Sequence, residues 1–319
     1  MKNIIKYAWC VLLLVPLVHC VHAEPWFTGP LLALDGASVE PGHASLETYT
    51  YFTSLPGSDV VNRSSKLVTS SASSNTVINP IFTYGLVKGL DVELSLPYVL
   101  NYNQGQAGKY IGDVAVQLGW QILEQEKTPW HTDVRITLQE IFPTGPYQKL
   151  NPAFAGTDGT GTGSYQTVLG LNFQQVHHLG KLFYLRTRLS VSYLYAASVD
   201  LNGYNTYGGN ALTHGRINPG NQGIIDLAGE LSLTQNWAVV MEGYYYNEQV
   251  SRFKGFPGVG EDKLPLVLGY SNINSISLAP AIEYNFSENY GIIAGAWYSV
   301  SGNADSTFTS AVIAFSAYW

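Results

Sequence analysis

Cysteine, charged residues and long hydrophobic runs are all scarce in this chain. Its two cysteines, Cys10 and Cys20, both lie within the first twenty residues, so the rest of the chain can form no disulfide. Charged residues make up 12% of the 319 residues, against about 25% in an average soluble domain. No stretch approaches the ~20 apolar residues of a spanning helix. These shortages argue against a disulfide scaffold, a helical membrane protein and an ordinary soluble domain.

The N-terminus is typical of an exported protein. Lys2 and Lys6 precede an apolar run over residues 8–18, and "VHA" ends at Ala23, which predicts a secretory signal peptide over residues 1–23 that is cleaved after Ala23. A lipoprotein would need a small residue before Cys20, where His19 stands. Cleavage leaves 14 basic against 23 acidic residues, a net charge of −9. We therefore expect no nucleic-acid partner.

Apolar residues alternate with polar or small ones along most of the remaining chain. In "GDVAVQLGWQI", residues 112–122, every second side chain from Val114 to Ile122 is apolar, which is the period of a β-strand. The stretches "DVELSLPYVLNY" and "FYLRTRLSVSYLY" repeat the pattern. Similar runs occupy about 44–54, 75–86, 131–142, 165–176, 223–234, 237–248, 274–286, 290–301 and 307–319. About twelve strands are predicted.

The lengths of the connections decide the architecture. Short turns such as "LVKGLD" and "SEN" alternate with long polar segments, and two shorter loops complete the series. The long segments lie near 55–74, 143–164, 197–222 and 249–271, and the shorter loops near 103–111 and 302–306. Antiparallel strands with short turns at one end and long loops at the other predict an all-β, up-and-down transmembrane barrel over residues 44–319. The sheet must close, because lipid permits no open edge.

A soluble β-sandwich or lipocalin-like barrel also alternates, but its outward polar face should be rich in Lys and Glu. Here the polar face carries mainly Ser, Thr, Asn, Gln and Gly, and aromatic residues cluster near strand ends. Examples are Tyr102, Trp120, Tyr165, Trp237 and Tyr290. Such aromatic girdles favour a barrel in the outer membrane of a Gram-negative bacterium. Three prolines inside predicted strands, Pro80, Pro97 and Pro280, each predict a local bulge.

The chain ends in "SAVIAFSAYW", whose residues Ala311, Ile313, Phe315, Ala317 and Trp319 share one strand face. We expect this apolar face to meet membrane lipid and the last strand to pair with the first, closing the barrel. Phe315 and Trp319 are the predicted closure and assembly signal, and the expected partners in assembly are outer-membrane lipid and the barrel assembly machinery.

The polar face places ten charged residues toward the lumen, seven acids and three arginines. They are Glu93, Asp113, Asp133, Arg135, Arg186, Arg188, Asp226, Glu230, Glu242 and Glu283. Because a charge facing lipid is costly, the arginines belong inside, where cross-strand pairs with the acids are expected. Two interpretations remain open: the charges line an aqueous path and favour cations or polar neutral molecules, or they form a network that fills the lumen.

The segment 24–43 precedes the first strand and contains "GPLLALDG", which is apolar for a periplasmic tail. It is either a plug that enters the barrel or a leader that packs on the barrel rim.

Several stretches resemble a known family. They are "PYVLNYNQGQAGKYIGDVAVQLGWQ", "LQEIFPTGPYQKLNP", "GTDGTGTGSYQTVLGLNF" and, near the start, "GPLLALDGASVEPGHASLETY". Together they are similar to the family of outer-membrane proteins associated with the meta-cleavage pathway of phenol degradation. The resemblance implies an outer-membrane barrel that helps small, often aromatic or hydrophobic, molecules to cross.

Catalytic and cofactor motifs are weak. The sequence contains no "GxSxG" and no evident Ser/His strand pair, so an outer-membrane hydrolase is the less favoured alternative and we expect no enzyme. "GTDGTGTG" lacks the Lys and Ser/Thr of a phosphate loop, and His177–His178 has no further ligand nearby, so no metal or cofactor is expected. The favoured function is passage or uptake of a small-molecule solute. A non-conducting surface barrel that acts through its extracellular loops is the other alternative.

Overall fold

The computed structural model describes residues 25–56, 59–61, 67–69, 72–125, 131–180, 183–260, 263–303 and 307–319. The signal peptide predicted over residues 1–23 lies outside these ranges. Apart from one short 3-10 turn, η1 (Pro152–Phe154), the regular structure in these ranges is β-strand. In the described ranges, no helix is both long enough and apolar enough to cross a membrane.

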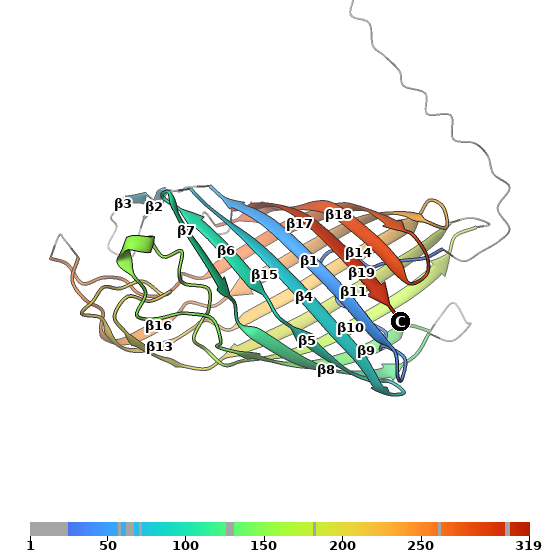
Figure 1. Cartoon of the computed structure of the whole chain (residues 1–319), viewed down its shortest axis with the longest axis horizontal. Coiled ribbons are helices and arrows are strands. Elements are labelled where there is room, and N and C mark those ends of the chain that lie inside the picture. The colour runs from blue at the N-terminus through green and yellow to red at the C-terminus, as the bar shows by residue number, and fades with distance from the viewer. Residues whose placement is uncertain are drawn as a thin grey trace, which may run out of the picture.

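Twelve antiparallel strands of the described chain close into one barrel (Figure 1). Each strand pairs with the next around the ring, and β1 pairs with both β4 and β19. The ring consists of β1 (Ala44–Leu55), β4 (Ser73–Val87), β5 (Leu90–Ser95), β8 (Val114–Leu123), β9 (Asp133–Phe142), β10 (Gln166–His178), β11 (Tyr184–Ala196), β14 (Gln222–Ser232), β15 (Trp237–Glu248), β17 (Ile273–Asn285), β18 (Tyr290–Gly302) and β19 (Thr309–Tyr318). The predicted fold class is confirmed.

The last strand closes the barrel as its alternation predicts. The backbone groups of Ala44 and Trp319 exchange two hydrogen bonds, at 2.8 and 2.9 Å. Ile313, Phe315 and Trp319 are exposed on the outer face, whereas Val312 and Ala314 are buried on the inner face. An apolar outer surface is stable only in lipid, so this strand has the faces that a membrane barrel requires.

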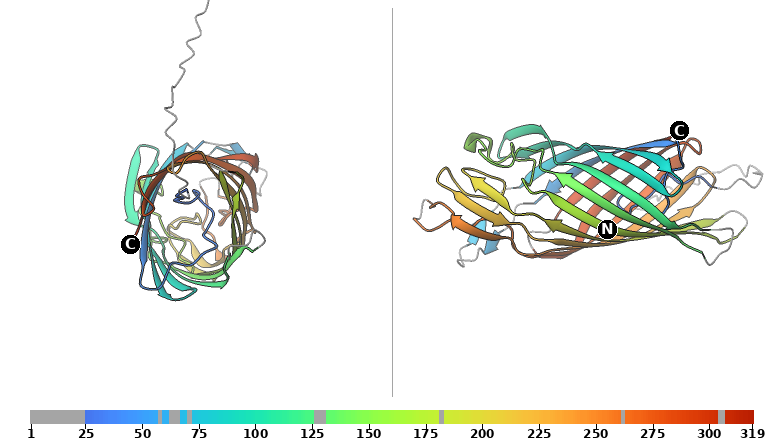
Figure 2. Two further views of the ribbon diagram at one scale, coloured as in Figure 1. Left: turned by 90° about the vertical axis from the view of Figure 1, so that its right-hand side faces the viewer. Right: turned by 90° about the horizontal axis from the view of Figure 1, so that it is seen from below.

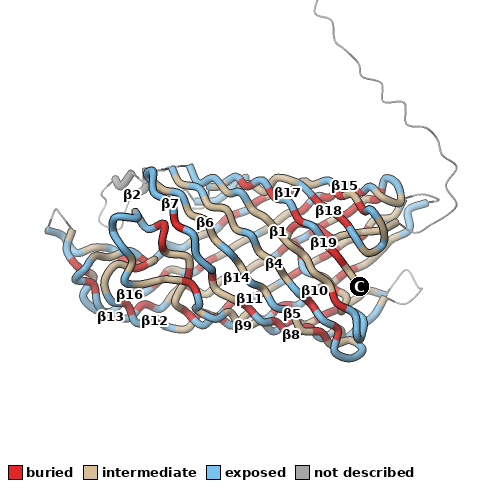
Figure 3. The backbone as a smooth tube through the Cα atoms, viewed as in Figure 1, coloured by how far each residue is buried: buried red, intermediate tan, exposed pale blue. Residues whose placement is uncertain are grey.

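Exposed and buried residues alternate along many strands of the wall, as in β8, β15 and β19 (Figure 3). Exposed aromatic side chains form a belt at each end. At the end that holds the C-terminus they include Trp120, Trp237, Tyr290 and Trp319, and at the opposite end Tyr165, Tyr193, Tyr195 and Tyr245. We take the end with the termini and short turns as periplasmic and the end with the long segments as extracellular.

The wall departs from the predicted strands at its prolines. The strand predicted through Pro97 is two strands, β5 and β6 (Tyr98–Asn103), and the loop predicted over 103–111 contains β7 (Gln106–Ile111). Near Pro80, β4 changes partner from β6 to β5, and pairing of β17 with β18 lapses around Pro280. Proline has no N–H to donate to a ladder, so each of the three sites interrupts regular pairing.

The long extracellular segments, predicted as loops, contain further strands. β2 (Asp59–Val61) pairs with β3 (Leu67–Thr69), and β12 (Val199–Asn202), β13 (His214–Asn218) and β16 (Arg252–Phe256) form a three-stranded sheet. The sheet extends β11, β14 and β15 beyond the barrel (Figure 1). Sequence alternation missed these strands because each is five residues or shorter.

Candidate functional site

The segment from residue 25 to residue 43, here called the leader, runs inside the ring of strands (Figure 2, left). It enters beside the β14–β15 turn, where Trp26 N–H donates to the carbonyl of Gln235 at 3.0 Å, and it leaves along β4, where Gly42 N–H donates to the carbonyl of Gly85 at 2.9 Å. Between these points it contacts strand after strand of the inner wall. The leader is thus held by the wall itself.

Apolar packing fixes the middle of the leader. Leu31 is buried in a cluster with residues of β15, β17, β18 and β19, and Leu32 packs against the same cluster. The wall members of this cluster are Val240, Ala279, Ile293, Val312 and Ala314. Leu31 and Leu32 of "GPLLALDG" therefore pack against the inner face of the wall, where burial of their apolar side chains is favourable.

Wall glycines leave room for the leader backbone. A Cβ on Gly85 would collide with the carbonyl of Glu40, and a Cβ on Gly291 would collide with the side-chain hydroxyl of Thr28. Any larger residue at either site would push the leader away from the wall.

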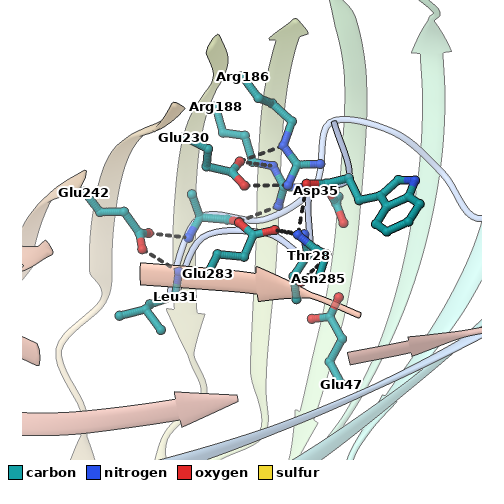
Figure 4. Close-up of polar contacts among 12 residues, drawn as sticks. Thr28, Leu31, Asp35, Glu47, Arg186, Arg188, Glu230, Glu242, Glu283 and Asn285 are labelled. Carbon is teal, nitrogen blue, oxygen red and sulfur yellow. Dashed lines mark hydrogen bonds and ion pairs between the residues drawn. The ribbon is translucent and has the colours of Figure 1, made fainter. Parts of the chain in front are cut away.

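Glu242 on β15 binds three consecutive leader amides, and Figure 4 shows its carboxylate pointing toward Leu31. Its carboxylate accepts from the N–H of Leu31 at 2.5 Å and from those of Leu32 and Ala33 at 3.0 Å each. Hydrogen bonds to an ionised acceptor are stronger than neutral ones. Because Glu242 is fully buried, it clamps the leader at this turn.

Glu283 on β17 holds the start of the leader. It accepts a hydrogen bond from Thr28 N–H and another from the side-chain amide of Asn285 at 2.6 Å. The same amide donates to the carbonyl of Trp26 at 2.9 Å. Two neighbouring wall residues on one strand face therefore satisfy the polar groups of the leader's first turn.

Two arginines of β11 lie beside Glu230 of β14, and one of them, Arg188, also binds the leader (Figure 4). Arg186 forms a two-pronged ion pair with Glu230, at 2.7 and 2.6 Å, and the two residues are register partners on β11 and β14. Arg188 lies 3.8 Å from Glu230, forms an ion pair with Asp35 of the leader and donates to the carbonyl of Ala33 at 3.1 Å. The expected cross-strand pairing is present, and it continues into the leader.

A second ion pair joins two strands on the inner face of the wall. Arg135 on β9 contacts Asp91 on β5 at 2.5 Å and donates to the carbonyl of Asp35 at 3.4 Å. Asp91 also accepts from the N–H of Val39 at 3.1 Å, and the neighbouring Ser38 N–H donates to Gln121 at 2.9 Å. The second half of the leader is therefore anchored by polar side chains of β5, β8 and β9.

The other predicted lumen residues have different surroundings. Glu93 accepts from Gln117 at 3.0 Å, and Asp133, near the periplasmic end, accepts from the side chain of Gln121 at 2.9 Å and the backbone of Gln125 at 2.7 Å. Asp226 is buried, and neither of its carboxylate oxygens has a hydrogen-bond partner within the described ranges.

Asp113 lies at the break between β7 and β8 and binds an extracellular segment. It accepts from Gly145 N–H at 3.0 Å and from the N–H and hydroxyl of Thr162 at 2.7 and 2.8 Å. Thr144 closes the break itself, because its hydroxyl donates to the carbonyl of Gly112 at 2.8 Å and accepts from Val114 N–H at 3.0 Å. The Gly–Asp pair and "FPTG" thus join the wall to segment 143–164.

Three further acidic residues line the lumen but are not in the predicted set: Asp35, Glu47 and Asp91. Asp91 stands two positions before Glu93 and therefore on the same strand face, so the signal was present. Glu47 shares its face with Tyr49 and Tyr51, which makes that strand apolar on both sides and hides its orientation. Asp35 belongs to no strand, so periodicity could not place it.

Two cavities lie between the leader and the β1 side of the wall. One, of about 240 Å³, is lined by leader residues and by Glu47, Tyr49, Tyr51 and Glu93. The other, of about 260 Å³, reaches the β17–β18 turn at Asn289. Asp35, Glu47 and Arg188 line both cavities. The leader contacts most strands of the ring, and the two cavities leave open space between it and part of β1.

The titratable groups of the site do not form a metal centre. Within the described ranges, no group of three or more His, Cys, Asp or Glu residues is arranged to hold a metal ion. Apart from Asp226 and Glu47, the acids named above contact arginines, backbone N–H groups or side-chain amides.

No protein-family model and no curated protein matches the chain. Among solved structures, it is similar to the COG4313 outer membrane channel from Pseudomonas putida F1, with a TM-score of 0.64 and 12% identity over 89% of this chain and 98% of that one. A NanC porin structure covers 85% of this chain and 98% of its own, with a TM-score of 0.44 and 11% identity. The CymD monoaromatic hydrocarbon channel covers 88% of both chains, with a TM-score of 0.38 and 10% identity. The first of these similarities shows that the chain has the fold of an outer-membrane β-barrel.

Proposed function

We propose that the protein is an outer-membrane channel through which small solutes pass passively along the β1 side of the lumen. The observation that carries the proposal is the pair of cavities that share Asp35, Glu47 and Arg188. A twelve-stranded barrel is wider than the eight-stranded barrels whose interiors side chains fill. Here the leader occupies part of the width, and space remains beside it. The shared fold with a protein described as a channel supports the same function.

In this proposal the leader is a plug that narrows the lumen. Glu242, Glu283, Arg188 and Asp91 bind it from four strands, so its position is fixed from several sides. The charged residues of the lumen then have two roles. Some bind the plug and so help to fill the lumen, and others line the path.

The path is acidic where it passes the plug. Asp35 and Asp91 are each paired with an arginine, whereas Glu47 and Glu93 form no ion pair among the described residues and bond instead to Tyr49 and Gln117. A net negative lining favours cations and polar neutral molecules. Tyrosines and Ile81 line the same cavity, and the sequence resemblance likewise favours cargo with an aromatic or hydrophobic body.

Single-channel conductance in a planar bilayer tests the proposal. The refolded mature chain, starting at residue 24, is compared with a chain that lacks residues 25–43. Steady small conductance in the first and larger conductance in the second are expected, because removal of the plug leaves an unobstructed lumen. Silence in both, with heat-modifiable migration showing that both have folded, would refute the channel and favour a surface barrel that acts through its loops.

A further inference from the structure

The three-stranded sheet β12–β13–β16 stands directly beyond the extracellular aromatic belt. β12 begins three residues after β11 ends at Ala196, and β13 and β16 likewise adjoin β14 and β15. Below them, Tyr193, Tyr195 and Tyr245 are exposed on the outer face of the barrel. Exposed aromatic residues of this kind lie at the headgroup level. The sheet therefore rises from the membrane surface at the level of the lipid headgroups and above.

One face of this sheet is turned toward the barrel mouth. Val199, Leu201 and Ile217 pack against Tyr207, whose hydroxyl donates to the carbonyl of Thr162 at 2.6 Å. Thr162 in turn binds the wall residue Asp113, and its hydroxyl accepts from the inward side chain of Gln166 at 3.3 Å. Tyr207 is thus on the luminal side, and the opposite face of the sheet points away from the barrel axis.

That outward face is basic. Asp200, Arg216 and Lys254 are register neighbours across the three strands, and Arg252 lies in the next row beside Asn218. Arg216 forms a two-pronged pair with Asp200 at 2.7 and 3.0 Å, which holds the pKa of Asp200 below its usual range. Arg252 and Lys254 are exposed and form no ion pair within the described ranges. The face carries three positive charges against one negative charge.

We propose that this outward face of β13 and β16 binds the phosphate groups of outer-leaflet lipid. Arg252 and Lys254 supply positive charge that has no acidic partner among the described residues, and the aromatic belt below them supplies the apolar contact for the same lipid. Basic residues next to a membrane surface attract anionic headgroups, and each contributes independently. Guanidinium groups suit phosphate oxygens because they can donate two parallel hydrogen bonds.

The position of the face favours lipid over other anionic partners. A soluble acidic protein or a nucleic acid would meet the protein at the loop tips, whereas these basic residues lie on the side of the sheet, next to the belt. A second copy of this chain would bring like charges together. The face therefore fits a partner that surrounds the barrel laterally.

The test uses the refolded full mature chain in a zwitterionic detergent, with bis-phosphorylated lipid A as the probe and binding followed by native mass spectrometry. We expect binding that weakens with salt and that weakens about tenfold or more in Arg252→Gln/Lys254→Gln, since two surface charges are lost. Lys88→Gln is the matched control, because Lys88 is an exposed lysine in the β4–β5 turn at the periplasmic end, paired with Glu124 at 3.1 Å. It should bind like the wild type.

Two further binding measurements distinguish lipid phosphate from free phosphate. Dephosphorylated lipid A should bind at least about tenfold more weakly than the bis-phosphorylated form, and millimolar inorganic phosphate should not displace the lipid. Equal affinity of the double variant and the wild type would overturn the proposal, as would equal binding of both lipids. Displacement by inorganic phosphate alone would show a site for free anions and would overturn the assignment to lipid.

Discussion

Arg188 on β11 forms an ion pair with Asp35 of the leader, and the same guanidinium donates to the carbonyl of Ala33 at 3.1 Å. One buried wall side chain thus binds two leader residues that are two positions apart. Because the side chain of Asp35 also borders both cavities, this contact links the position of the plug to the width of the proposed path.

Asp35→Asn should loosen the plug and raise the mean single-channel conductance toward that of the chain without residues 25–43. The substitution removes the charge that pairs with Arg188, while Glu230 stays 3.8 Å from Arg188, so the buried guanidinium is not left without an acidic neighbour. Asp200→Asn is the control, because Asp200 is an exposed acid paired with an arginine outside the lumen. Wild-type conductance in Asp35→Asn, beside a larger value for the truncated chain, would count against this role.

The double substitution Arg186→Ala/Arg188→Ala should raise the preference of the channel for cations. It removes two positive charges and leaves Glu230 and Asp35 without their arginine partners, so the lumen becomes more negative. The reversal potential in a salt gradient measures the change, after heat-modifiable migration has shown that the variant folds. Arg216→Ala, outside the lumen, should leave the reversal potential unchanged. An unchanged value in the double variant would refute the assignment of these arginines to the path.

The barrel was predictable from sequence because lipid imposes a strict rule on every strand. Ile313, Phe315 and Trp319 had to alternate with residues facing inward, so the period of two identified strands, and the charges of "RTR" had to lie inside. The contacts of the leader follow no such rule. Leu31 and the Glu242 that binds it are 211 positions apart, and nothing local in "GPLLALDG" specifies that partner.

The strand breaks were hidden for a similar reason. Pro97 and Gly112 are visible in the sequence, but the break between β7 and β8 depends on a distant segment: Thr144 satisfies the polar groups of the break, and Gly145 donates to Asp113 beside it. The contact of Asp113 with segment 143–164 could therefore not be predicted from the local sequence. The fold could be predicted from the period of two. The site could not, because it depends on contacts between segments that are far apart in the sequence.

Phe315→Asp should block assembly of the barrel, because it places a charge on the lipid-facing side of the closing strand. Deletion of Trp319 should do the same, since its backbone exchanges both hydrogen bonds with Ala44 at the seam. Heat-modifiable migration on a gel measures folding in each variant. Ser316→Lys is the control for a charge on the inner face: Ser316 is the neighbour of Phe315, lines a cavity inside the barrel and is the register partner of Glu47, so a lysine there meets an acid. Normal migration of Phe315→Asp would contradict the prediction.

Thr144→Val should lower the free energy of unfolding by about 1 to 3 kcal/mol, because the carbonyl of Gly112 and the N–H of Val114 both lose their partner. Thr144→Ser keeps the hydroxyl and should stay within about 0.5 kcal/mol of the wild type. Urea unfolding in detergent, followed by tryptophan fluorescence, measures both. Equal stability of the Val and Ser variants would mean that the hydroxyl does not support the strand break.

Glu47→Gln should reduce the preference of the channel for cations. Glu47 lines both cavities, and its hydrogen bond at 3.0 Å comes from the neutral hydroxyl of Tyr49, so in its ionised form it adds negative charge where the path passes the plug, and the recordings are made at alkaline pH to keep it ionised. Glutamine has nearly the same volume and still accepts from Tyr49, so conductance in the absence of a salt gradient should change less than the reversal potential does. Glu124→Gln, an exposed acid in the β8–β9 connection, is the control for a charge outside the lumen. A reversal potential that shifts equally in both variants would show that Glu47 acts only through the overall charge of the protein, and no shift in either would place the path elsewhere in the barrel.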